Sequence, residues 1–242
     1  MDEATSKREP HWRAILTSTD FYRDILVTIL GVLIALGIGQ LAQDADWKRK
    51  ATSGTEAIDA ELAYNMATFA ERAMIQPCLD RRTRQLEDIY AAARRTRQLP
   101  AIGSFGATPY RQLETAAWED AVGNGVLGHF DPRQKAGLAS VYPTIARYNE
   151  FVMEEQELWY RLQLIQNAKG PVSDSMLTDI GATLKVLTYR ARMNGLLAQQ
   201  LLQYSTGRGI KPNLTLFGDK ATLNSLAADV AKRPICQPLA VG

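Results

Sequence analysis

The chain has 242 residues, and its 28 lysines and arginines nearly balance its 26 aspartates and glutamates, which gives a formal net charge of +2. A chain with so little net charge lacks the positive field that recruits nucleic acid, so no nucleic-acid partner is expected. A local basic run that contains Arg81, Arg82 and Arg84 is followed at once by Glu87 and Asp88, which is typical of a solvated helix face.

An uncharged apolar segment, Ile25–Ala42, follows a short N-terminal stretch. As a helix it would extend about 27 Å, close to the roughly 30 Å hydrocarbon thickness of a bilayer. The sequence therefore predicts a transmembrane helix at residues 25–42, in contact with membrane lipid. A short segment (1–24) precedes it, and a domain of ordinary size (43–242) follows it.

Residues 1–24 are polar and basic, which favours an uncleaved signal anchor. A cleaved signal peptide is the alternative, because Gly37 and Gly39 offer small residues at the spacing that a signal peptidase reads, although the apolar run continues past them. Basic residues on the two sides of the span nearly balance, so the charge rule decides little. We expect a cytoplasmic N-terminus and an exported domain, which is the usual geometry for an N-terminal anchor.

Within the span, Gly31, Ala35 and Gly39 recur every four residues and share one helix face. Small residues at this spacing let a second helix approach closely where lipid supplies no hydrophobic driving force. The alternative is that glycine is simply common in membrane helices. We expect this face to pack against another transmembrane helix, either of a second copy or of a larger membrane complex.

The two cysteines, Cys78 and Cys236, lie far apart in the sequence. In an oxidising compartment they could form one disulfide that closes a long loop and ties the C-terminus to the start of the domain. Two free buried thiols are the alternative. Neither cysteine belongs to a C-x-x-C pair and the only histidines are His11 and His129, so neither a metal nor a cofactor is expected.

Apolar periodicity predicts helices along the whole domain. The first continues from the membrane helix through Ile58, Leu62, Met66 and Phe69, with Glu61 and Glu71 elsewhere on the helical wheel. We expect a weak point at Ser53 and Gly54, an end at Pro77 and a second helix over residues 79–98. A loop rich in proline and glycine follows.

Further helices are predicted from about Tyr110 to Gly123, Pro132 to Ala168, Ser175 to Tyr204 and Lys220 to Ala231, with a kink at Pro143. The start at Pro132 is well marked, because Asp131 is a favourable N-cap and proline suits the first helical position. No convincing alternation of apolar and polar residues indicates a strand. The fold class expected is all-α, with a single N-terminal transmembrane helix followed by an antiparallel helical bundle.

No catalytic constellation is apparent, so no catalytic residue is assigned and an enzyme is not expected. His129 has Asp131 close by, but a loop histidine beside a helix start explains it better than a triad base. Glu154, Glu155 and Glu157 point in different directions on a helix, which favours a solvated face over a paired acid–base site.

The central third of the chain is rich in aromatic residues. Trp118 and Tyr142 could line a pocket between helices, with His129 and Asn124 as polar groups at its mouth. Core packing is the favoured explanation, because most of these aromatic residues fall at helical spacing.

Four features stand out along the chain. They are the GVLIALGIGQ stretch, Trp47 followed by Lys48 and Arg49, the E-L-x-x-N of Glu61, Leu62 and Asn65, and Trp118 leading into Gly125, Val126 and Leu127. With these features together, the chain resembles a family of uncharacterised bacterial proteins. The resemblance implies one N-terminal membrane helix, a helical domain and a bacterial inner-membrane setting. It implies no catalytic residues.

The function expected is that of an accessory or scaffolding subunit of an inner-membrane complex, or of a homo-oligomer, acting through protein contacts. The alternative is a periplasmic small-ligand sensor or binding module. Because residues 1–24 are too few for a foldable output domain, such a sensor would signal only through a partner.

Overall fold

The computed structural model describes residues 19–106 and 108–242. His11 and most of the segment predicted to be cytoplasmic lie outside the described residues. The chain divides into two units, residues 1–52 and 53–242. One helix, α2 (Thr19–Thr96), contributes to both.

The expected all-α class is confirmed. Beyond α2 the second unit contains α3 (Ala116–Gly123), α4 (Pro132–Gln163), α5 (Asp174–Gly207) and α6 (Leu223–Lys232), with short 3-10 helices η1 (Val126–His129), η2 (Leu214–Phe217) and η3 (Pro234–Cys236). A minimal antiparallel sheet pairs β1 (Gln98–Leu99) with β2 (Gly170–Pro171). Two-residue strands are too short to produce a recognisable alternation of apolar and polar residues in the sequence.

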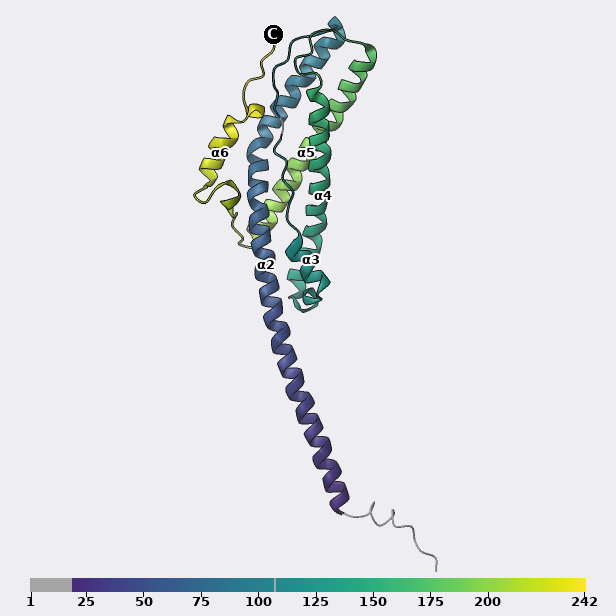
Figure 1. The fold of residues 1–242 in the computed structure, drawn as a ribbon, viewed down its shortest axis with the longest axis vertical. Helices are drawn as coiled ribbons and strands as arrows, with labels where there is room; N and C mark the ends of the chain where they lie inside the picture. Colours follow the sequence, from purple (N-terminus) through teal and green to yellow (C-terminus); the bar gives the residue numbers. More distant parts are fainter. Residues whose placement is uncertain (1–18, 107) are drawn as a thin grey trace, which may run out of the picture. The chain divides into compact units, whose positions relative to one another are not determined.

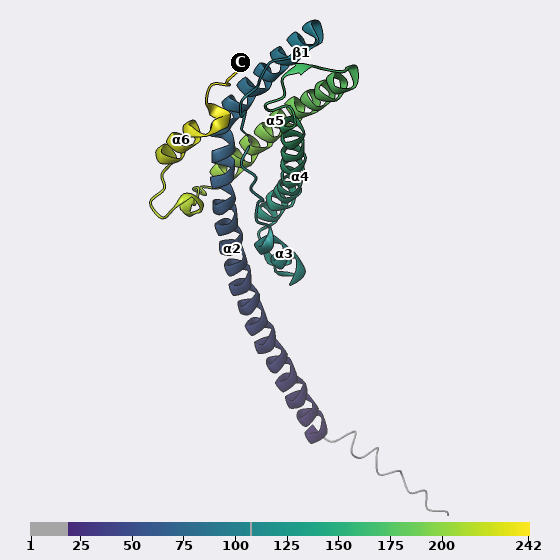
Figure 2. The same cartoon turned by 45° about the horizontal axis from the view of Figure 1, so that its top comes forward.

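Within the second unit, α2, α4 and α5 lie side by side, and α6 lies against α2 on the side away from α4 (Figures 1 and 2). Their buried side chains form one core, to which α2 contributes Ile75, Leu79 and Leu86, α4 contributes Trp159 and Leu162, α5 contributes Leu184 and Leu187, and α6 contributes Leu226 and Val230. The bundle therefore places the polar side chains of three long helices within reach of one another.

The predicted helix end at Pro77 is wrong, because α2 continues through it to Thr96. Proline lacks the N–H that would bond to the carbonyl of Ala73, which weakens one turn and bends a helix without ending it. Ile75 and Leu79, on either side, are 1% and 0% exposed in the same core, so packing offsets the lost hydrogen bond. The ribbon of α2 bends within the second unit (Figure 1).

No break occurs at Ser53 and Gly54 either. A Cβ atom on Gly54 would lie 3.1 Å from a methyl group of Val126 and 3.3 Å from the ring of Phe130. Glycine at this position allows a close approach between α2 and η1, rather than a weak point in the helix.

The predicted bounds of two helices need correction. α3 begins at Ala116 rather than near Tyr110, because the backbone of Leu113 and Glu114 is bonded to side chains of other helices instead of to its own turn. α4 ends at Gln163 rather than near Ala168, and the chain turns before β2. Its start is as predicted: Asp131 accepts hydrogen bonds from the backbone of Arg133 (2.9 Å) and Gln134 (3.2 Å).

Candidate functional site

The apolar part of α2 is the clearest functional feature of the first unit. It contains an 18-residue window of mean hydropathy 2.4, none of which is buried inside the chain. By length and composition, it is the one helix among the described residues that is suited to crossing a membrane. A Cβ atom added to Gly31 or Gly39 would meet no atom within 4 Å, and Ala35 is exposed. No contact among the described residues therefore requires small side chains at these positions.

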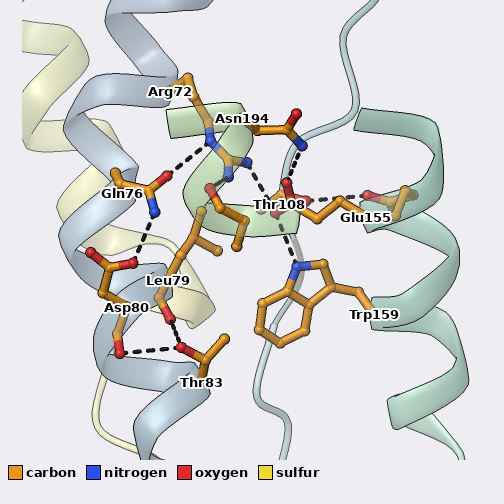
Figure 3. Close-up of polar contacts among 11 residues, drawn as sticks. Arg72, Gln76, Leu79, Asp80, Thr83, Thr108, Glu155, Trp159 and Asn194 are labelled. Atoms are coloured by element: carbon orange, nitrogen blue, oxygen red, sulfur yellow. Dashed lines mark hydrogen bonds and ion pairs between the residues drawn. The ribbon is translucent and has the colours of Figure 1, made fainter. Parts of the chain in front are cut away.

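Three helices of the second unit each place a polar residue at a core position. Arg72 of α2, Glu155 of α4 and Asn194 of α5 are 6%, 0% and 0% exposed, and they meet between the helices (Figure 3). Arg72 Nη1 donates to Glu155 Oε1 over 3.0 Å, and Asn194 Nδ2 donates to Oε2 over 2.5 Å. The indole of Trp159 donates to Oε1 over 3.4 Å. Both carboxylate oxygens of Glu155 are thus engaged.

The remaining donors of Arg72 bond to the backbone of α5 and to a side chain of α2. Its Nη2 donates to the carbonyl of Ala191 (2.8 Å), and its Nε donates to Gln76 (3.1 Å), whose amide donates to Asp80 (2.9 Å). A Cβ atom on Gly195 would lie 2.6 Å from the amide oxygen of Gln76, so glycine is needed for this side chain to fit. We call Arg72, Gln76, Asp80, Glu155, Trp159 and Asn194 the buried polar network.

The expectation that Glu155 lies on a solvated face is therefore wrong, as is the same expectation for Arg82 of α2, which is 1% exposed. The sequence does contain a signal for the burial of these polar residues. The three-and-four spacing of the apolar residues on each helix is continued by Arg72, Glu155 and Asn194. A charged residue at a core position indicates a partner on a facing helix, because an unpaired buried charge is too costly to retain.

Glu71 makes a second buried ion-pair cluster. Its side chain is 2% exposed, and its two oxygens accept from Arg111 Nε (2.9 Å) and Arg233 Nη2 (2.5 Å). Arg111 belongs to the loop before α3, and Arg233 follows α6. One carboxylate of α2 therefore fixes two segments that are distant in the sequence.

The E-L-x-x-N residues of α2 hold the loop before α3. Asn65 donates to the carbonyl of Glu114 and accepts from its N–H, both over 2.8 Å. Asn149 of α4 pairs with Leu113 in the same way. Glu61, expected on the polar side of the wheel, is instead largely buried and accepts from the N–H of Ala117 (2.6 Å) in the first turn of α3. A carboxylate at this position suits the positive end of the helix dipole.

Trp118 and Tyr142, for which the sequence favours core packing over the lining of a pocket, are arranged as a packed pair. The rings of Trp118 and Tyr142 stack with centroids 4.6 Å apart. The hydroxyl of Tyr142 is buried and donates to Glu61 over 2.6 Å, whereas His129 is exposed at the end of η1. Burial, and then the bond to Glu61, raise the pKa of Tyr142 above its ordinary value. This hydroxyl is used in holding α2 to α4.

Cys78 and Cys236 form a disulfide between α2 and η3, with their Cα atoms 4.8 Å apart. Beside it, Arg82 Nη2 donates to the carbonyls of Pro234 (3.1 Å) and Gln237 (2.5 Å). Burial lowers the pKa of Arg82. A covalent bond and a buried guanidinium together hold the C-terminal segment to α2.

The residues that the structure describes thus form an all-α fold, with one helix suited to crossing a membrane and a helical domain held together by buried ion pairs and a disulfide. Comparison with protein-family models, with curated proteins and with solved structures finds no significant match. The resemblance to uncharacterised bacterial proteins therefore stays an expectation, and function has to be inferred from the residues of this chain.

Proposed function

We propose that this protein is a membrane-anchored helical interaction protein. It acts through protein contacts, as an accessory or scaffolding subunit of a bacterial inner-membrane complex or as a homo-oligomer. The observation that carries the proposal is the apolar window of α2, none of which is buried by residues 19–106 and 108–242. An apolar helix surface of this length needs lipid or another helix around it.

Two further observations support the proposed arrangement. No atom of the described residues would lie within 4 Å of a Cβ atom on Gly31 or Gly39, which supports a face reserved for a helix from outside the chain. The disulfide between Cys78 and Cys236 suits an oxidising compartment, which favours a cytoplasmic N-terminus and a periplasmic domain.

The proposal is tested by purifying the full chain in mild detergent with Gly31→Leu and Gly39→Leu introduced together. Bulkier side chains on this face keep the hydrophobic length but block close helix approach, so we expect loss of the co-purifying subunits or of self-association. Ile29→Leu with Ile34→Leu is the matched control off this face. A wild-type chain that is monomeric, carries no partner and is unaffected by the two glycine substitutions would rule out an interaction role for the span.

A further inference from the structure

Helix α5 carries an apolar stripe on the face opposite to its core. Val186, Tyr189 and Leu196 are 46%, 57% and 52% exposed, and Met193 is half-buried among them. Their spacing of three, four and three residues is the pattern with which one helix packs along another. We call these four residues the α5 stripe. The core side of α5 has the same spacing, so this helix presents two apolar faces, of which the part of the chain that the structure describes covers only one.

The α5 stripe is flanked by positive charge. Lys185 and Arg192 are exposed, and within residues 19–106 and 108–242 neither forms an ion pair. They stand two helical turns apart, roughly 10.5 Å. Two such stripes facing each other would bring like charges together, which disfavours direct α5-to-α5 pairing. The surface that covers the stripe needs carboxylates at a matching distance.

Helix α4 offers such a surface on its exposed side. A shallow hollow of about 720 Å³ is lined by Tyr110, Met153, Tyr160, Glu150, Glu154, Gln156 and Glu157, without a lysine or arginine. We call it the α4 hollow. Its aromatic and thioether side chains are exposed, Tyr110 by 44%, Met153 by 53% and Tyr160 by 58%. Glu154 and Glu157 are paired with Arg190 and Arg161, so Glu150 is the lining carboxylate without an ion pair in the described residues.

The charges of the two surfaces have the same spacing. Glu150 and Glu157 are two turns apart, as are Lys185 and Arg192. If α5 of one copy runs antiparallel to α4 of another, with Lys185 opposite Glu157 and Arg192 opposite Glu150, then Tyr189 falls opposite Met153. A parallel arrangement that also pairs these charges, Lys185 with Glu150 and Arg192 with Glu157, would instead place Tyr189 opposite Glu154.

The antiparallel register also pairs large side chains with small ones. It sets Tyr160 opposite Ala182, and Leu196 opposite Ala146, and both alanines are exposed. Alternation of large and small residues across facing positions lets two helices interdigitate. Charge, apolar character and size therefore agree on one register.

The contacts within the chain provide an independent check on this register. Arg190 of α5 ion-pairs with Glu154 over 2.6 Å, and its guanidinium lies 4.2 Å from the ring centre of Phe151, which shows which parts of α4 and α5 are level. A two-fold axis parallel to these helices would keep those levels between copies. The charge-matched register puts Arg190 level with Val152, between Phe151 and Glu154, as such symmetry requires.

We propose that a second copy of this chain docks on this face, with the α5 stripe of each copy lying antiparallel in the α4 hollow of the other. The two-fold axis makes the contact twice, which gives a closed symmetric dimer. This interface lies in the second unit and makes no use of the membrane span. The inference therefore goes beyond the proposed function and can fail or hold separately from it.

The test measures the mass of the full chain in detergent by analytical ultracentrifugation, over a range of protein concentrations. Lys185→Glu with Arg192→Glu, and separately Glu150→Lys with Glu157→Lys, are each expected to raise the dimer dissociation constant at least tenfold. All four substitutions together restore opposite charges across the interface, and we expect them to recover the dimer. Lys211→Glu with Lys220→Glu makes the same charge change at exposed positions elsewhere and serves as the control.

Each variant is also made with Gly31→Leu and Gly39→Leu, so that contacts through the span are separated from contacts through the α5 stripe. We expect dimers to persist without the small-residue face and to dissociate on charge reversal. A monomeric wild-type chain, a dimer unaffected by charge reversal, or a fourfold variant that stays monomeric overturns the inference. Dissociation caused by the glycine substitutions alone would support the proposed function and overturn this interface.

Discussion

At the scale of single residues, the raised pKa of Tyr142 makes the free energy of unfolding depend on pH. Burial raises its pKa above the ordinary value of 10.0, and the bond to Glu61 adds to the shift. Above about pH 10 the unfolded chain releases the phenol proton whereas the folded chain retains it, so the free energy of unfolding falls as the pH rises. The stability linked to this proton is fully present below about pH 10.

We expect Tyr142→Phe to reduce the alkaline loss of stability by up to about 1.4 kcal/mol per pH unit, measured by urea unfolding between about pH 9 and pH 11.5. At neutral pH the same change should cost about 1 kcal/mol, because Glu61 loses a hydrogen bond. Tyr160→Phe, at a residue 58% exposed, is the matched control. An unchanged alkaline slope in Tyr142→Phe would show that the hydroxyl is not held as described.

At the scale of elements, the buried polar network couples α2, α4 and α5. Removing the charge of Glu155 by Glu155→Gln leaves the guanidinium of Arg72 buried without its counter-ion, and we expect the free energy of unfolding to fall by about 3–5 kcal/mol. Replacing both partners by apolar residues, Arg72→Met with Glu155→Leu, should cost less than the single change, because no charge is left buried. Chemical denaturation of the wild-type chain, Arg72→Met, Glu155→Leu and the double variant completes a double-mutant cycle, and Glu155→Gln is measured beside them.

The control for this cycle is the exposed pair of Lys232 and Asp229, whose side chains are 77% and 69% exposed. Asp229→Asn should change the free energy of unfolding by less than about 1 kcal/mol, because water screens an exposed pair. A double variant of Arg72 and Glu155 that is less stable than the single variant would contradict an ion-pair role. It would indicate that shape, rather than charge, dominates this contact.

How far the sequence predicts each element depends on whether the signal comes from residues close in the sequence or from contacts with distant helices. Local rules identify the start of α4 from Asp131 and Pro132, and apolar spacing identifies the α4 and α5 core faces, because those signals involve residues close in the sequence. The continuation of α2 through Pro77 depends on burial against distant helices. The late start of α3 depends on Asn65 and Asn149, and no local pattern indicates that two amides from other helices bind its preceding loop.

The sequence predicts the candidate site less completely than the fold, because the contacts that form the site join residues distant in the sequence. The apolar window of α2 can be identified from the sequence because hydropathy depends only on residues close in the sequence. The pairing of Arg72 with Glu155 joins residues separated by 83 positions, and its position on the helical wheel indicates burial without identifying the partner. Charged residues at core spacing thus predict that a network exists, and the fold decides which groups form it.

At the scale of the whole molecule, the disulfide between Cys78 and Cys236 closes a loop across 158 positions, most of the second unit. Closing a loop of this length restricts the unfolded chain strongly, so reduction should lower the free energy of unfolding by about 2–5 kcal/mol. The C-terminal segment should nevertheless stay docked in the native state, because Arg82 and backbone bonds from Gly103 to Ala240 and between Ala101 and Gly242 also hold it. Urea unfolding with and without reductant measures the first effect, and limited proteolysis of the C-terminal segment measures the second.

The double variant Cys78→Ser with Cys236→Ser distinguishes loss of the disulfide from other effects of the reductant. Its free energy of unfolding should equal that of the reduced protein and should not change when reductant is added. Arg82→Met in the oxidised chain is the complementary change: it removes the carbonyl contacts of Pro234 and Gln237 and should increase proteolysis of the segment while the covalent link persists. Mass spectrometry of non-reduced protein that finds both cysteines as free thiols would contradict the disulfide and remove the support it gives to an exported domain. Retention of the bond with no effect of reduction on the free energy of unfolding would contradict the loop-closure argument. It would indicate that the reduced unfolded chain is already restricted to a similar extent.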